Sequence, residues 1–143
     1  MSDFILIDGD IVYFYPIFGL AIVMAQRGRL AGSGKGSVGG RALCIDGDEK
    51  KVSVPNCLYT AGPYSIPGSG ALKIYALARN QKASKTKSKG KPVLLKGVLF
   101  TAKFEVQSPA HSLPPGGAPI PDPYPFYIGK GFFRTTNTKL RGA

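Results

Sequence analysis

The chain has few of the residues on which catalysis and metal binding most often depend. It contains one histidine, two cysteines and only eight acidic residues among 143. Four of those acidic residues stand beside turn glycines, where an aspartate commonly hydrogen-bonds to its own backbone. They are Asp8, Asp10, Asp46 and Asp48. Acid–base catalysis by paired carboxylates is therefore disfavoured, and we expect the protein not to be an enzyme.

Two cysteines do not make a disulfide framework, but they leave a metal site or a reactive thiol open. Cys44, Cys57 and His111 offer three ligands for one metal ion, such as zinc or iron, with water or a carboxylate as the fourth. No pair has the short Cys-x-x-Cys spacing, and Cys44 fits equally well as a small buried hydrophobe in mid-strand. Cys57 follows the Pro55-Asn56 turn and is the better candidate for a ligand or a nucleophile.

Long hydrophobic runs and signal sequences are also missing. The uncharged run 11–26 is too short for a comfortable membrane span and contains Pro16 and Gly19, so it predicts buried strands around a turn. Three of the first ten residues are acidic, Asp3, Asp8 and Asp10, where a secretory signal would have basic ones. We expect a protein made in the cytoplasm without a signal peptide.

Glycine and proline are plentiful, and they favour strands over helices. The chain has nineteen glycines and twelve prolines, yet 43% of its residues are hydrophobic. This composition predicts a mainly β fold with many short strands joined by tight turns. Only the stretch 71–84 has a helix-compatible composition, and a strand at Leu72–Tyr75 followed by a basic loop explains it as well.

The sequence repeats itself at an interval of fifty residues. Gly40–Gly47 and Gly90–Gly97 both read glycine, basic, small, aliphatic, apolar, aliphatic, charged, glycine. A partial third copy, Ile5–Asp10, repeats the ending found at Leu43–Asp48. Each copy predicts a short strand, a glycine turn and a second strand. The fold class that follows is a small domain of short glycine-bounded hairpins with internal pseudo-repeats.

One segment explains much of the net charge of +11. Six basic residues and no acidic ones lie in Arg79–Lys91. We interpret Asn80–Lys89 as an exposed basic loop inserted into the second copy, with Lys82, Lys85, Lys87 and Lys89 in solvent. Contact with phosphate or lipid headgroups is the alternative. A basic, β-barrel-like module that binds nucleic acid is the competing function, but the run lacks interleaved aromatic residues and makes nucleic acid an unlikely partner.

The C-terminal part differs in composition. The segment 111–125 holds six prolines and two glycines, which predicts a surface connector and not a core strand. Tyr127–Leu140 then predicts a final strand or hairpin. We therefore divide the chain into a β-hairpin domain, residues 1–110, and a Pro-rich connector with a C-terminal strand, residues 111–143.

The repeated phrase resembles that of the PAAR-repeat spike-tip family. Val38–Asp48 is similar to the recurring phrase of that family, and Asp8-Gly9-Asp10 resembles its opening Gly-Asp. Lys89–Gly97 resembles a later copy, in which Lys96-Gly97 replaces the usual acidic ending. The resemblance covers about residues 5–106 and leaves the Pro-rich tail unexplained.

The resemblance implies a fold and a function. The resemblance implies the shape of a blunt cone, built from short hairpins with pseudo-threefold symmetry. One copy of a PAAR-repeat protein caps the trimeric β-helical spike of contractile injection machines, such as type VI secretion systems and phage-tail-like particles. It sharpens the spike, sometimes carries effector cargo, touches the target membrane briefly and leaves the cell on firing. A tip-bound metal held by histidines and cysteine is also implied, of which only Cys57 and His111 match here.

Two apolar segments are the best material for the base of such a cone. Val12–Phe18 and Tyr127–Phe133 hold more large apolar residues than one small hairpin buries easily. We therefore predict that they contribute to the surface that meets the spike, because an interface core is apolar. The partner-binding candidates are Tyr13, Phe14, Phe132 and Phe133. The alternative is that these aromatic residues fill the domain's own core.

Overall fold

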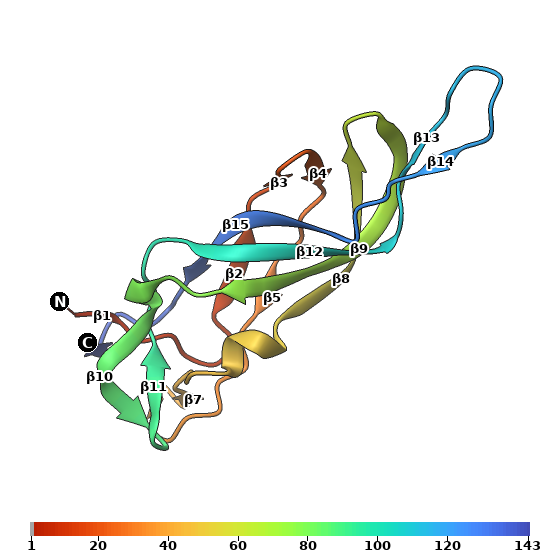
Figure 1. The fold of residues 1–143 in the computed structure, drawn as a ribbon. Helices are drawn as coiled ribbons and strands as arrows, with labels where there is room; N and C mark the ends of the chain where they lie inside the picture. Colours follow the sequence, from red (N-terminus) through yellow and green to blue (C-terminus); the bar gives the residue numbers. More distant parts are fainter. Residues whose placement is uncertain (1) are drawn as a thin grey trace.

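The chain folds into a tapering body built almost wholly from strands (Figure 1). This is a computed structural model, and it describes residues 2–143. Strands account for 56% of the chain and helices for 5%, far below the helical third of an ordinary globular protein. The mainly β prediction is confirmed. No helix among the described residues is long and apolar enough to cross a membrane.

A curled antiparallel sheet of ten strands forms most of the body. Its main path runs β3, β4, β8, β9, β12, β15, β2, β5. In chain order these strands are β2 (Ile11–Phe14), β3 (Ile17–Phe18), β4 (Ala21–Val23), β5 (Gly28–Arg29), β8 (Ser53–Ala61), β9 (Tyr64–Ala76), β12 (Phe100–Ser108) and β15 (Phe126–Arg134). A short hairpin of β13 (His111–Ser112) and β14 (Ile120–Pro121) attaches to β9 and reaches the narrow end of the body (Figure 1).

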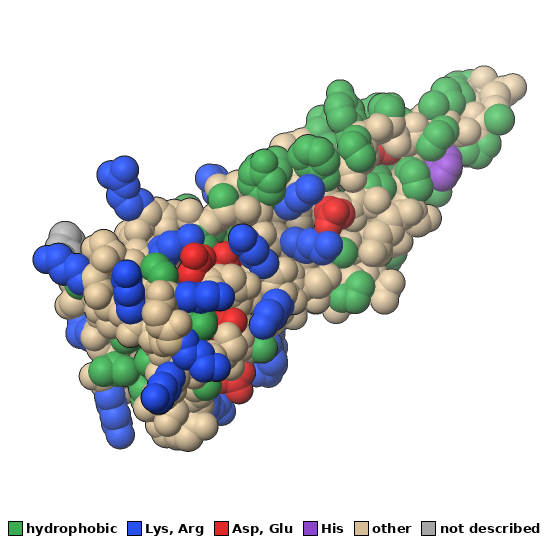
Figure 2. All heavy atoms as spheres, turned by 60° about the horizontal axis from the view of Figure 1, so that its bottom comes forward, with side chains coloured by type: hydrophobic (Ala, Val, Ile, Leu, Met, Phe, Trp, Pro, Cys, Tyr) green, Lys and Arg blue, Asp and Glu red, His purple; other side chains and the backbone are tan. Residues whose placement is uncertain are grey.

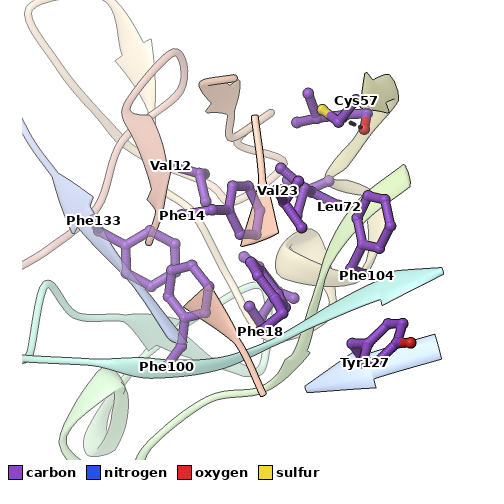
Figure 3. Close-up of a cluster of buried hydrophobic side chains, with 14 of the residues drawn as sticks. Val12, Phe14, Phe18, Val23, Cys57, Leu72, Phe100, Phe104, Tyr127 and Phe133 are labelled. Carbon is purple, nitrogen blue, oxygen red and sulfur yellow. Dashed lines mark hydrogen bonds between the residues drawn. The ribbon is translucent and has the colours of Figure 1, made fainter. Parts of the chain in front are cut away.

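The core fills the inside of the curl, and alternation along the strands builds it (Figure 3). Every second side chain of a strand points to the same face, so Val12 and Phe14 of β2 face inward. On β15 the inward positions include Gly129 and Gly131. A Cβ on Gly129 would lie 2.6 Å from Cδ2 of Phe18, so the glycine makes room for that ring.

The three repeat copies meet around a pseudo-threefold axis. They are the segments Ile5–Ile7, Leu43–Ile45 and Val93–Leu95, which bridge to one another in a closed cycle and are called here the ring. The backbone N–H of Leu6 donates to the carbonyl of Leu94, that of Leu94 to Cys44, and that of Cys44 to Leu6, each at 2.9 Å. The register within the ring is the one given by aligning the repeats in the sequence.

Three two-stranded arms lead into the ring at the wide end of the body (Figure 1). The first arm is β6 (Ser37–Val38) with β7 (Arg41–Ala42), the second is β10 (Lys82–Ser88) with β11 (Lys91–Leu94), and the third is β16 (Arg141–Gly142) with β1 (Asp3–Phe4). The first two arms have two-residue turns in which both residues have positive φ, as this kind of hairpin requires. In the third arm, residues 2 and 143 occupy the place of the turn.

The basic segment is a strand of the second arm, so the prediction of an inserted loop at Asn80–Lys89 was wrong. Ala83 is buried and packs against the hydrophobic residues of the ring. Gln81 is fully buried at the end of η2 (Arg79–Gln81), one of the two short 3-10 helices in residues 2–143. Lys82 lies between these two inward residues, and it is exposed like Lys85, Lys87 and Lys89. The strand β10 is the counterpart of β6 in the first arm, and nothing is inserted.

The C-terminal part, residues 111–143, folds with the rest of the chain. The strand β15 lies between β12 and β2, and β16 pairs with β1. Residues 126–142 therefore complete the main sheet and the third arm. The Pro-rich segment between them forms the β13–β14 hairpin and its loop.

The other 3-10 helix, η1 (Asp48–Lys51), follows the ring segment Leu43–Ile45 and leads into β8. Asp48 is 2% exposed there, and its Oδ2 accepts the backbone N–H of Ile45 at 2.9 Å. Asp10 holds the equivalent position after the ring segment Ile5–Ile7, where its Oδ2 accepts the N–H of Ile7 at 2.8 Å. These two hydrogen bonds hold the backbone in place where the chain leaves two of the ring segments.

Candidate functional site

The two ends of the molecule differ sharply in charge. Lysine and arginine side chains gather at the wide end, whereas hydrophobic side chains gather toward the narrow end (Figure 2). The segments 15–26, 52–72 and 106–126 build the narrow end and contain no lysine or arginine. Their one acidic residue, Asp122, is buried. Each end therefore suits a different kind of contact.

The arms carry the basic residues of the wide end. Nine lysines and arginines lie on or beside their strands, and all nine are exposed: Lys35, Arg41, Lys82, Lys85, Lys87, Lys89, Lys91, Lys139 and Arg141. One of them is paired within the chain, since Lys82 lies 3.0 Å from Asp46. The wide end is thus a positively charged surface, which favours an acidic partner.

The ring gives this surface a rigid floor. Its outer residues form a hydrophobic cluster distinct from the main core, together with Ala83: Ile5, Ile7, Leu43, Ile45, Val93 and Leu95. Its central residues, Leu6, Cys44 and Leu94, point the other way and belong to the main core. Because both faces of the ring are packed, the arms start from fixed positions.

The arms are also tied to one another. The backbone N–H of Lys35 on the first arm donates to Oγ of Ser88 on the second at 2.7 Å. The backbone N–H groups of Lys85 and Thr86 on the second arm donate to the carbonyl of Ala143 on the third, at 2.7 and 2.8 Å. Lys139 of the third arm lines a shallow cavity with Val38 of the first. The second arm is therefore hydrogen-bonded to both of the others.

The predicted metal ligands are not brought together. Cys44 lies in the ring, where burial, with a smaller contribution from Asp48, raises the pKa of its thiol. Cys57 is buried in β8 with its Sγ 3.7 Å from the carbonyl oxygen of Val54. His111 lies in β13 near the narrow end. Within residues 2–143 no three histidine, cysteine or acidic side chains form a group that could hold a metal ion.

The predicted partner-binding aromatics divide into two pairs. Phe14 and Phe133 are buried in the core, 8% and 1% exposed, and they face Phe100 inside the curl. Tyr13 and Phe132 lie on the outer face of β2 and β15, where their rings stack at 5.1 Å. Only Tyr13 and Phe132 are accessible to another molecule. They lie on the sheet and not on the arms.

A buried carboxylate holds the narrow end together. Oδ2 of Asp122 accepts the hydroxyl of Tyr59 at 2.7 Å and that of Tyr127 at 2.8 Å. Its Oδ1 accepts the backbone N–H of Tyr124 at 3.0 Å. Burial raises the pKa of Tyr59 to about 12 and also raises that of Tyr127. Sequence reasoning missed Asp122, because its tyrosine partner on β8 lies 63 residues away.

Sequence reasoning also missed Lys35 and Lys139 as members of the basic surface. The repeat was aligned only over the second strand of each hairpin and the residues after it. Extending the alignment back through the turns would have matched β6 with β10 and made Lys35 and Lys85 equivalent positions. The third arm is beyond any such alignment, because its two strands lie at opposite ends of the chain.

Comparison with known proteins identifies the family. No curated protein matches the chain. A family model does match, over residues 1–143, and its description is contractile injection system spike tip protein. The match covers the whole chain, including the Pro-rich segment that the PAAR resemblance leaves unexplained. The chain therefore belongs to the family of contractile injection system spike tip proteins.

Proposed function

We propose that one copy of this protein caps a trimeric β-helical spike, with its wide end docked on the spike and its narrow end leading. Its family makes it a structural tip and a part of an injection particle, and implies association with a spike or central-tube protein. A structural tip of this kind has a non-enzymatic role. The observation that carries the proposal is the pseudo-threefold ring with its three arms.

A single chain can match a threefold partner only if its own docking surface repeats three times. A symmetric trimer presents the same strand ends at three positions around its axis. The ring repeats its hydrogen bonds three times, each at 2.9 Å, and each arm continues from one ring segment. Short two-stranded arms offer unpaired strand edges, which are the usual sites for pairing with another chain.

The narrow end fits the leading position. It has no exposed lysine, arginine or acidic side chain, and several large apolar side chains are exposed there: Ile17, Leu20, Ile22, Met24, Leu113 and Ile120. Brief contact of such a surface with a target membrane costs little desolvation free energy, because no charged group has to leave water. The proposal keeps two further roles implied by the PAAR resemblance, namely effector carriage and delivery outside the cell on firing.

Two matched insertions test the orientation. Four residues, Gly-Ser-Gly-Ser, are inserted between Gly39 and Gly40 at the turn of the first arm, or between Gly116 and Gly117 in the narrow-end loop. Gly39, Gly40 and Gly116 have positive φ and open surroundings, and Gly117 is exposed in the same loop as Gly116. Each insertion therefore lies in an exposed turn and should leave the fold intact. Co-purification with the trimeric spike protein of the same injection system measures docking, and native mass spectrometry measures stoichiometry.

We expect the first-arm insertion to abolish the complex and the narrow-end insertion to leave it intact, with one tip per trimer. Both variants should unfold at the temperature of the unmodified protein, within a few degrees. The opposite pattern, in which only the narrow-end insertion prevents binding, would overturn the proposed orientation. A complex with three tips per trimer would overturn the single-copy cap.

A further inference from the structure

We infer that three lysines at equivalent positions of the arms, Lys35, Lys85 and Lys139, each bind the same carboxylate on the three chains of the spike. They are called here the lysine triad. The inference rests on the proposed function, because it assigns chemistry to the docking surface of the wide end. It names the partner's contribution as a threefold set of aspartate or glutamate side chains.

The three lysines occupy one structural position, counted back from the ring. Ile5 and Leu43 are equivalent ring residues, and their N–H groups donate to the carbonyls of Leu140 at 3.1 Å and Gly36 at 3.2 Å. In the second arm, Ser88 pairs with Lys91 across a two-residue turn, as Val38 pairs with Arg41 in the first. Counting back from these pairs makes Thr86 the equivalent of Gly36. In each arm the residue before this position is a lysine.

Each triad lysine lies where the pairing of its arm becomes irregular. In the first arm the N–H of Gly34, and not of Gly36, donates to the carbonyl of Leu43 at 2.8 Å, so Lys35 lies in a bulge. In the second arm the register shifts between Lys82 and Lys87, which spans Lys85.

In the third arm, a side chain replaces a backbone donor. Nδ2 of Asn137 donates to the carbonyl of Ile5 at 2.8 Å, and its Oδ1 accepts the N–H groups of Lys139 and Leu140 at 3.0 Å. Bulges bend a strand and redirect a side chain, and they recur next to functional sites. All three lysines are exposed.

Hydrogen bonds from the backbone N–H groups of two of these lysines to a neighbouring arm hold their positions in place. Lys35 is bonded to Ser88, and Lys85 to Ala143. A lysine on a fixed backbone gives up less conformational freedom when it pairs than one on a mobile loop. The triad is therefore suited to recognition at defined points and is more than a diffuse positive field.

No other charged position repeats its sign in all three copies. The equivalents of Asp3 are Arg41 and Lys91, and the equivalents of Asp8 are Asp46 and Lys96. A symmetric trimer presents each of its own side chains three times, so only a position that repeats in the tip can be matched at all three points. In the part of the chain described, residues 2–143, no triad lysine takes part in an ion pair.

The test compares two triple variants that remove the same charge. One is Lys35→Gln, Lys85→Gln and Lys139→Gln, and the other is Lys89→Gln, Lys91→Gln and Lys96→Gln. All six lysines are exposed at the wide end, and only the first set is threefold. Binding to recombinant spike trimer is measured as a Kd at about 50 and about 300 mM salt, a range over which exposed ion pairs weaken. Thermal unfolding checks that both variants fold.

We expect the triad variant to lose roughly tenfold to hundredfold in affinity at low salt, since each exposed pair contributes about two- to fivefold. Its affinity should also depend less on salt than that of the unmodified protein. The control variant should lose only about twofold. Equal losses in both variants, or no loss in either, would overturn the triad. If the triad variant binds normally while the first-arm insertion does not bind, docking by the wide end stands and only the triad falls.

Reversing the charges on both partners tests whether the lysine triad binds carboxylates. Lys35→Glu, Lys85→Glu and Lys139→Glu together should prevent binding to the natural spike. They should restore binding to a spike trimer in which one acidic residue of its terminal turn is replaced by lysine. Failure of every such replacement to restore binding would show that the partner does not offer a carboxylate to the triad.

Discussion

Asp122 shows how one side chain can secure the narrow end. It lies in a segment with too little secondary structure to support itself, yet it is only 4% exposed. Its carboxylate joins a strand on each side, through Tyr59 of β8 and Tyr127 of β15. Hydrogen bonds to a charged acceptor are among the stronger ones in proteins. The β13–β14 hairpin at the narrow end is therefore fixed to the sheet by a residue that is not itself in a strand.

Asp122→Asn should lower the free energy of unfolding by about 1–3 kcal/mol, because an amide accepts at one atom only. With its oxygen in the place of Oδ2 it keeps both tyrosine hydroxyls, but its NH2 then faces the backbone N–H of Tyr124, which loses its acceptor. Urea unfolding followed by tyrosine fluorescence measures the change. Asp46→Asn is the matched control, since that carboxylate is at the surface and its pair with Lys82 is exposed. Its effect should stay below about 1 kcal/mol. Equal effects of the two substitutions would contradict the role given to Asp122.

At the scale of the element, β15 is notable for what its inner face lacks. Its inward positions read Tyr127, Gly129, Gly131 and Phe133, so two glycines stand between two aromatic residues. A Cβ on Gly131 would collide with the ring of Phe100 and with the carbonyl of Tyr13 on the neighbouring strand. The two glycines leave no side chain on this face, which lets the rings of Phe18 and Phe100 approach the strand closely.

Gly131→Ala should destabilise the fold by roughly 1–3 kcal/mol, the usual cost of adding atoms to a packed core. The collision involves backbone, which cannot rotate away. Gly117→Ala is the control, because its Cβ would meet only the ring of Pro114, at 3.1 Å, in an exposed loop. Thermal unfolding of both variants measures the difference. A neutral Gly131→Ala would mean that β15 does not approach Phe100 as closely as described.

The elements that could be predicted from the sequence are those whose signal is local. The equivalence of the three ring segments follows from the repeat, because each copy carries an apolar triplet and an Asp-Gly or Lys-Gly exit. The strand β10 was hidden, since its exposed lysines outnumber the inward Ala83 and Ser88 and give it the composition of a loop. The place of β15 and the third arm depend on pairing between distant segments, for which a single sequence carries no signal.

The whole molecule should lose stability at high pH. Folding raises the pKa of Cys44, Tyr59 and Tyr127, chiefly through burial, above their ordinary values of 9.0, 10.0 and 10.0. Each group is an acid that is neutral when protonated, so the folded state holds its proton more tightly than the unfolded state. This contribution is fully present below about pH 9 and is lost as the pH rises from there through the folded-state values.

Urea midpoints measured between pH 8 and 11 check this dependence. The midpoint should be nearly constant at first and fall above about pH 9. Tyr127→Phe should flatten the fall, because it removes one of the three groups while keeping the ring. Lysine deprotonation also begins in this range, and the comparison with the variant separates the two effects. A midpoint that does not fall up to pH 11 would contradict the burial of these three groups.

The separation of charge between the two ends has a consequence for the free molecule. With its basic residues on the arms and sheet and exposed apolar side chains at the narrow end, the chain has the layout of a surfactant, with a head and a tail. At a boundary between water and an apolar phase, the state of lowest free energy immerses the tail and leaves the head hydrated. The isolated protein therefore has a preferred orientation at any such boundary, and that orientation matches the one proposed for the tip on its spike.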